Sequence, residues 1–349
     1  MYDWFQRLFK PVQKNAAIVA APILAEAATL TAPQAAPPAV SGISRMQRDE
    51  LNADFSNCLF GASDNAEIFI SQSESEILAA LEKIVRSSQS GANLVRRMPG
   101  VIPQLLQSLR TEAFSGADLA QKISHDVVLV AEVLRLANSA CHHVSKSITS
   151  IEHAILILGH GGMRQLITGV AFKPIIDLKS GHFTTLAALN IWEQSTQCAV
   201  ANRLLAQNAG VDPFEAFMAG LMQYVGLIAA LRVMDQMSVD GRLIGSISFF
   251  DSLLSQARIL SCNIGREWHF PEAVISAIEE QGSMVGNAAM SPIGKILSTG
   301  DYLSKMQLLH QQLRLDIHAA HVTQGLSEQE LACLRQLDAL DDGVQASAG

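Results

Sequence analysis

Cysteine pairs, aromatic residues and charged residues are all scarce in this chain, and each shortage excludes a class of protein. The five cysteines lie far apart, and no Cys-x-x-Cys pair occurs. Disulfide scaffolds and zinc knuckles need closer or even-numbered sets. We therefore expect reduced, mostly buried thiols in a cytosolic protein. The cysteines are Cys58, Cys141, Cys198, Cys262 and Cys333.

Aromatic residues make up only 5% of the chain and charged residues 17%, whereas hydrophobic residues reach 49%. Alanine, leucine, isoleucine, valine and methionine must therefore fill the interior, which suits packed helices better than a β-sandwich. The 349 residues suffice for one large domain or two ordinary ones. The composition alone thus favours an all-α protein with a sizeable core.

An excess of positive charge is also missing. The formal net charge is −8, so the chain has no general attraction for phosphate backbones, and we expect no nucleic-acid partner. No apolar run reaches the length of a membrane-spanning helix. Residues 16–30 resemble the core of a signal peptide, but Pro22 and Glu26 interrupt them. These features predict a cytoplasmic protein.

The N-terminal segment is predicted to be an amphipathic piece followed by a linker. On a helix, Trp4, Phe5, Leu8 and Phe9 would share one face until Pro11 ends it. That face could contact a membrane surface weakly or dock on a partner, fray as a tail, or pack back on the body. Residues 16–40 are rich in alanine and proline, and 41–74 are weakly patterned. We expect residues 1–74 to be largely disordered.

Helical periodicity begins at Ser75 and continues through residues 75–290, with residues 291–349 predicted as C-terminal helices that pack on this domain and end in a short disordered tail. The clearest helix start is Asp212, followed by Pro213. That helix is predicted to run to about Met234 with Gly220 and Gly226 inside it. A glycine in a helix costs about 1 kcal/mol, which suggests close approach of a neighbouring helix.

Two ordered sets of segments carry a family resemblance. Residues 134–140 read LRLANSA, and 150–155 read SIEHAI before a Leu-Gly pair. Further along, residues 192–195 read WEQS and 219–228 read AGLMQYVGLI. Over about residues 99–281 the chain resembles the HDOD family, a branch related to HD-domain phosphohydrolases. The resemblance implies a helical bundle in two lobes and a bacterial signal-transduction role.

The resemblance also implies that the metal-binding residues of an active HD enzyme are missing. Such an enzyme holds one or two metals with imidazoles and carboxylates, and the metal acidifies a water for attack on phosphorus. The family's His-Asp pair falls on Gln223 and Tyr224, and an upstream histidine falls on Gln194. Tyrosine is a poor ligand near neutral pH because its pKa is about 10. Only Asp301 matches the family's last aspartate, in a loose alignment.

The remaining family positions agree with this loss. The lysine that usually follows the His-Asp pair falls on Leu227, and a later histidine pair falls on Gln281 and Gly282. We therefore expect no metal, no cofactor and no enzymatic activity. Gln194, Gln223 and Tyr224 are expected to hydrogen-bond one another in a buried polar cluster, or to line a repurposed small-molecule pocket.

The leading hypothesis is a non-catalytic signalling module that acts through protein partners. The alternatives are a sensor of a small ligand or nucleotide in the degenerate pocket, and a phosphohydrolase with an altered metal set. Asp126, Arg135, Asn138 and Ser139 match prominent positions of the family pattern. They are expected either to make capping and packing hydrogen bonds or to form a patch that contacts a partner.

Other chemical candidates are weaker. His142, His143, His153 and His160 lie close in sequence, but intervening glycines argue against one helix that aligns them. His318 and His321 have the i, i+3 spacing that can chelate a metal on a helix, without an evident third ligand. A glycine-rich stretch at residues 159–162 lacks the preceding strand and Lys-Ser or Lys-Thr pair of a phosphate-binding loop.

Overall fold

Every secondary-structure element described by the computed structural model is an α-helix, which confirms the predicted all-α class. The structure describes residues 42–61, 69–87, 148–176, 181–237, 244–282 and 290–345, with a few residues between 130 and 138. The helices are α2 (Arg45–Phe60), α3 (Gln72–Arg86), α7 (Ile151–Ile176), α8 (His182–Ala206), α9 (Pro213–Met222), α10 (Val225–Gln236), α11 (Ile247–Glu267), α12 (Glu272–Glu280), α13 (Pro292–Gln311) and α14 (Glu328–Gln345).

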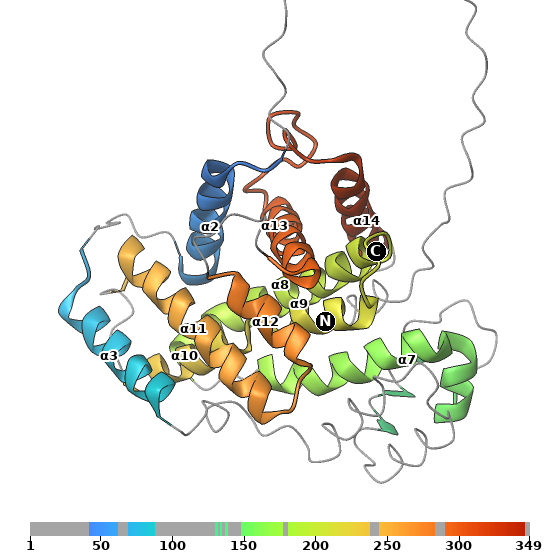
Figure 1. Ribbon diagram of the computed structural model, residues 1–349, viewed down its shortest axis with the longest axis horizontal. Helices are drawn as coiled ribbons and strands as arrows, with labels where there is room; N and C mark the ends of the chain where they lie inside the picture. The colour runs from blue at the N-terminus through green and yellow to red at the C-terminus, as the bar shows by residue number, and fades with distance from the viewer. Residues whose placement is uncertain are drawn as a thin grey trace, which may run out of the picture.

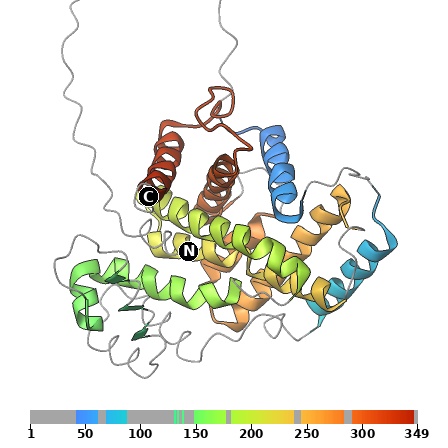
Figure 2. The ribbon, with the colours of Figure 1, turned by 180° about the vertical axis from the view of Figure 1, so that it is seen from behind.

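Helix α8 is the central element of the bundle. It packs against α9, α10, α13, α14 and α2, and most of its residues are buried. Helices α2, α13 and α14 stand beside one another on one side of α8, while α3 lies at the far end against α10 and α11 (Figures 1 and 2). Most of residues 88–147 lie outside the described part of the chain, so the predicted division into two lobes stays a prediction.

Helix α2 is a described helix within residues 1–74, a segment that was predicted to be largely disordered. Ser44 and Gln47 form a capping box at its start, in which each side chain bonds the other's backbone N–H. Its buried side chains are Leu51, Phe55 and Leu59, spaced four residues apart on the face that packs against α13 and α8. This spacing is visible in the sequence but stands among polar residues, which conceal it.

Helix α3 begins at Gln72, with Ser71 as its N-cap, rather than at the predicted Ser75. Ser71 and Glu74 form its capping box, and Glu74 is buried at 1% exposure. The Glu74 carboxylate also accepts hydrogen bonds from the backbone N–H groups of Gly245 and Ser246 and from the Ser246 hydroxyl, each at 2.9 Å. One carboxylate therefore joins the start of α3 to the start of α11.

Replacing Glu74 with glutamine is expected to cost about 2 kcal/mol of unfolding free energy at pH 7, because an amide cannot accept all these bonds. Burial alone would raise the pKa of Glu74, but the donors of Gly245, Ser71 and Ser246 together hold this pKa below its ordinary value. The carboxylate's contribution is thus present above the ordinary pKa and is lost as the pH falls through the lower folded value. Urea unfolding of the parent and the Glu74→Gln variant at pH 7 and near pH 3 tests this. A difference in unfolding free energy that is the same at both pH values contradicts it.

Helix α7 bends where glycine permits it. Gly159 has φ 68° and ψ 174°, so the helix is kinked at this residue. The helix then continues to Ile176, past Pro174. A proline inside a helix removes one N–H bond and crowds the preceding turn, and α7 ends two residues after Pro174.

Two glycines mark close helix approaches, as the sequence predicted. A Cβ at Gly220 would lie 2.6 Å from the backbone of Ala199 on α8. A Cβ at Gly226 would lie 1.9 Å from the carbonyl oxygen of Ala257 on α11. The first contact draws α9 against α8 and the second draws α10 against α11.

Two stretches of the described chain are long and apolar enough to cross a membrane by length and composition, contrary to the sequence-based expectation. They are Ile151–Phe172 and Pro213–Gln236, and 61% and 89% of their most apolar windows are buried inside the protein. Most of Pro213–Gln236 therefore lies in the core of the bundle, whereas Ile151–Phe172 is only partly buried there.

Candidate functional site

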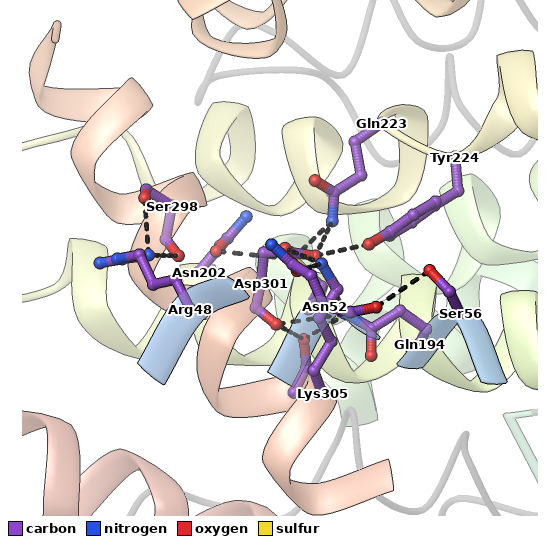
Figure 3. A network of polar contacts seen from close by, with 12 residues as sticks. Arg48, Asn52, Ser56, Gln194, Asn202, Gln223, Tyr224, Ser298, Asp301 and Lys305 are labelled. Atoms are coloured by element: carbon purple, nitrogen blue, oxygen red, sulfur yellow. Dashed lines mark hydrogen bonds and ion pairs between the residues drawn. The ribbon is translucent and has the colours of Figure 1, made fainter. Parts of the chain in front are cut away.

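The Asp301 carboxylate is the centre of a polar network between α2, α8, α13 and the junction of α9 with α10 (Figure 3). Its Oδ1 accepts hydrogen bonds from the Tyr224 hydroxyl at 2.8 Å and from the Gln223 and Gln194 amides at 3.1 Å each. The three predicted residues thus converge on Asp301. The expectation that they bond one another is wrong, because a carboxylate is the stronger acceptor.

The other oxygen of Asp301 faces a lysine. Lys305, one turn further along α13, places Nζ 2.6 Å from Asp301 Oδ2, and it also donates to Asn52 Oδ1 at 2.8 Å. Its ammonium lies 5.0 Å from the centre of the Phe55 ring. The Lys305 side chain is 9% exposed and that of Asp301 is 21% exposed. A cation supplied by the chain itself therefore neutralises the single carboxylate.

Helix α2 supplies residues that the sequence analysis missed. Arg48 donates to the carbonyl and hydroxyl oxygens of Ser298 at 3.2 and 3.1 Å, and Asn52 accepts from Lys305. Arg48, Asn52 and Ser56 are four residues apart, so they form a polar stripe along the helix, and Figure 3 shows them beside the network. In the sequence, the signal that could have identified these residues is a polar stripe beside the apolar face of the same helix.

An interruption between helices α9 and α10 places the side chains of Gln223 and Tyr224 in the network. The helix predicted to run from Pro213 to about Met234 is two helices, with Gln223 ending α9 and Tyr224, at φ −100° and ψ 1°, starting α10. Ser261 on α11 stabilises the junction, since its hydroxyl donates to the Gln223 carbonyl and accepts from the Gly226 N–H, both at 2.8 Å. These bonds hold backbone groups that the interrupted helix leaves unpaired.

Gln194 approaches the network from the middle of α8, where it is fully buried. Besides Asp301, its amide donates to the Ser304 hydroxyl at 2.8 Å. Cys198, one turn later, accepts from the Gln223 amide at 3.1 Å. Burial, with a smaller contribution from Asp301, raises the pKa of the Cys198 thiol well above its ordinary value. This sulfur is therefore a neutral thiol and not a nucleophile or metal ligand at neutral pH.

Tyr224 is likewise a neutral donor. Burial raises its pKa well above 10, and both the charge of Asp301 and the hydrogen bond to it act in the same direction. The proton stays on the phenol because a phenolate beside a carboxylate would bring two negative charges together. Tyr224 thus stabilises the Asp301 carboxylate and does not add an anionic ligand.

The metal that the HD fold would hold does not fit this donor set. Within the described residues, no group of three or more His, Cys, Asp or Glu side chains is placed to bind a metal ion. Gln281 donates its amide to the backbone carbonyls of Ala277 and Gly294, and Leu227 is buried among apolar residues. Among the described residues that bond one another in the network, Asp301 alone offers a carboxylate, and Lys305 lies against it.

A cavity of about 950 Å³ opens beside the network. Helix α2 lines one wall, α10 and α11 another, and α13 a third, with Asp301, Lys305 and Tyr224 among its lining residues. The size falls within the range of small-molecule sites. A cavity therefore adjoins the degenerate site, and its use as a small-molecule pocket stays a prediction.

The remaining sequence candidates do not join this site. Asn138 bonds backbone groups, donating to the Leu134 and Ile148 carbonyls and accepting from the Ile148 N–H. His318 and His321 lie in turns between α13 and α14, so their predicted helical spacing is wrong. Other candidates lie outside the described residues: Trp4, Phe5, Leu8, Phe9, Asp126, Arg135, Ser139, His142 and His143.

Solved structures share the fold. A Shewanella amazonensis protein named as a candidate metal-dependent phosphohydrolase matches 77% of this chain and 99% of its own, with a TM-score of 0.53 and 16% identity. A Marinobacter aquaeolei protein named as a candidate signal transduction protein matches 82% of this chain and 68% of its own, with a TM-score of 0.55 and 18% identity. At such identities the likeness concerns the fold alone.

The fold and the site define the class: an all-helical HD-like protein in which a lysine–carboxylate pair occupies the centre of the site. The family model of the HDOD domain matches residues 95–284, more than half of the chain, and the chain belongs to the HDOD family. An uncharacterized protein of Treponema pallidum is 21% identical over 216 residues, covering 58% of this chain. The chain spans 40% of the length of that curated relative.

Proposed function

We propose that the protein is a non-catalytic bacterial signal-transduction module that works in the cytoplasm through protein partners, without metal or cofactor. The observation that carries the non-catalytic part is the Lys305 ammonium 2.6 Å from Asp301 Oδ2. Hydrolysis in an HD site depends on a metal that acidifies water. A lysine at this distance provides the positive charge but cannot ligate a water.

The polar side chains around Asp301 support this proposal. Gln194, Gln223 and Tyr224 all present hydrogen-bond donors to the carboxylate, whereas a metal site requires acceptors that point at one ion. A metal placed here would have to displace Lys305 and turn three donors away. The network therefore serves as a rigid polar junction between four segments of the bundle.

A protein-binding role is supported by the fold's exposed apolar residues and by its relatives. Leu186 and Leu189, one turn apart on α8, are 45% and 69% exposed. Exposed apolar side chains that adjoin one another are typical of contact surfaces. The Marinobacter relative is named as a candidate signal transduction protein. The N-terminal face of Trp4, Phe5, Leu8 and Phe9 and the patch around Asn138 are further proposed contacts.

Purified full-length protein, incubated with Mn²⁺, Fe²⁺ or Zn²⁺ and then desalted, is expected to retain well below one equivalent of metal and to leave phosphodiester substrates intact. Elemental analysis and a hydrolysis assay check this. Stoichiometric metal, together with hydrolysis that Asp301→Asn abolishes, would instead establish the alternative, a phosphohydrolase with an altered metal set.

The partner-binding part has its own experiment. Full-length bait and a Leu186→Asp, Leu189→Asp variant are used in parallel to capture proteins from native lysate, with an Ile259→Asp variant as control. Ile259 is 45% exposed on α11, so this control introduces an aspartate at an exposed apolar position outside the α8 surface. A partner that the double variant loses and the control keeps supports the proposal. Identical capture by all three proteins would show that the α8 surface does not bind the partner.

A further inference from the structure

The cavity beside Asp301 carries more positive charge than its own carboxylates can pair. Four cationic side chains line it, Arg45, Arg48, Arg258 and Lys305, against three carboxylates, Asp49, Asp251 and Asp301. Lys305 is paired with Asp301 at 2.6 Å. Arg45 lies 3.6 Å from Asp49 at the exposed rim, where both side chains are more than 60% exposed.

Among the described residues, no carboxylate forms an ion pair with the other two guanidinium groups. Arg48 bonds only the neutral oxygens of Ser298 and lies over the Tyr302 ring at 5.4 Å. For Arg258, the described part of the chain provides neither a hydrogen-bond acceptor nor a carboxylate within 4.0 Å. Asp251, the third carboxylate of the lining, is an exposed residue of α11.

Both arginines are partly buried. Burial lowers the pKa of Arg48 and of Arg258, and the charge of Asp301 only partly offsets this. A partly buried cation without an anionic partner gives up part of its hydration, and a bound anion would compensate for that loss. Gly282 helps to seat Arg258, because a Cβ at this position would lie 2.7 Å from its guanidinium.

The rest of the lining is suited to an uncharged molecular body. Apolar side chains from α10, α11 and α12 and from the start of α13 face the cavity, among them Leu227, Phe250, Leu254, Ile278 and Met290. The volume of about 950 Å³ accommodates a nucleotide-sized molecule. Guanidinium groups bind phosphate through paired N–H donors, and the flanking apolar wall takes up a base and sugar.

We propose that this cavity binds a phosphorylated small molecule of nucleotide size, with its phosphate against Arg258 and Arg48 and its uncharged part against the apolar wall. The Lys305–Asp301 pair keeps the cavity floor neutral, so that Asp301 does not repel the anion. No metal and no hydrolysis are needed. The proposal is independent of protein-partner binding, and its failure would leave the non-catalytic assignment in place.

Calorimetry and thermal-shift measurements on the full-length protein test the proposal with AMP, ATP, GMP and GTP, and with adenosine and guanosine as uncharged probes. At least one nucleotide is expected to bind and to raise Tm, and the matching nucleoside to bind at least tenfold more weakly. Arg258→Gln and Arg48→Gln should each weaken binding of that nucleotide by at least tenfold.

Arg266→Gln is the matched control, because Arg266 is also on α11 but pairs with Glu279 outside the cavity. It should bind the nucleotide as the parent does. The Tm of each protein without nucleotide shows whether it is folded. If loss of the Ser298 bonds unfolds the Arg48→Gln variant, the Arg258→Gln variant alone tests the proposal. The proposal is overturned by no nucleotide binding up to about 5 mM, by equal nucleoside binding, or by binding that Arg258→Gln leaves unchanged.

Discussion

Replacing Lys305 with methionine is expected to lower the free energy of unfolding by about 3 kcal/mol, because it leaves the Asp301 carboxylate largely buried without its cation. Methionine matches the unbranched apolar stem of lysine as far as Cε and lacks the ammonium, so the change removes mainly charge. The bonds from Tyr224, Gln223 and Gln194 remain but do not neutralise Asp301. Urea unfolding at pH 7 gives the measurement.

A double variant separates loss of charge from loss of packing. Adding Asp301→Asn to Lys305→Met removes the unpaired charge while keeping an oxygen that accepts from Tyr224. The double variant is therefore expected to recover at least half of the lost stability. Lys295→Met, at an exposed position of the same helix, is the control and should change stability by less than about 0.5 kcal/mol. A Lys305→Met protein as stable as this control would show that the pair contributes little.

Gly226→Ala is expected to be the most damaging single-methyl change in the described part of the chain, at about 4 kcal/mol or complete loss of soluble protein. The added Cβ would lie 1.9 Å from the Ala257 carbonyl oxygen and 2.4 Å from the Ser261 nitrogen. Both are backbone atoms of α11, so relief requires movement of a whole helix. That movement would also break the Ser261 bonds that hold the α9–α10 junction.

The same substitution at Gly161 is the matched control for Gly226→Ala. Gly161 is in helix α7, and a Cβ there would meet no atom within 4 Å. Alanine in an open helical position is expected to stabilise by about 0.5–1 kcal/mol, because it restricts the unfolded chain. Thermal and urea unfolding of both variants give the comparison. A Gly226→Ala protein with parental stability would show that α10 and α11 separate easily.

Local signals in the sequence were sufficient for the helical class and for many helix starts. The cap at Asp212 with Pro213 after it is a property of neighbouring residues, and it is present as predicted. The α2 helix was missed although its buried residues recur every four positions. The break at Gln223 and Tyr224 could not be predicted, because the bonds that stabilise it come from Ser261 on another helix.

The site shows the same division. The family resemblance identified Gln194, Gln223 and Tyr224 as the altered positions, and side-chain chemistry alone showed that they are poor metal ligands. Their common partner, Asp301, is 107 residues from Gln194 and 78 from Gln223 along the chain, in a segment whose alignment was loose. Lys305 and Asn52, which complete the network, are 253 residues apart.

By itself, the sequence determined an all-helical protein whose HD-type positions lack metal ligands, because periodicity, capping and the kinds of side chain are local properties. Only the tertiary structure decided what replaces the metal. Packing of α2 and α13 around α8 brings Asn52 to Lys305 and Lys305 to Asp301, and it leaves Arg48 and Arg258 facing a cavity. Such contacts depend on how distant helices cross, which no single segment of the chain encodes.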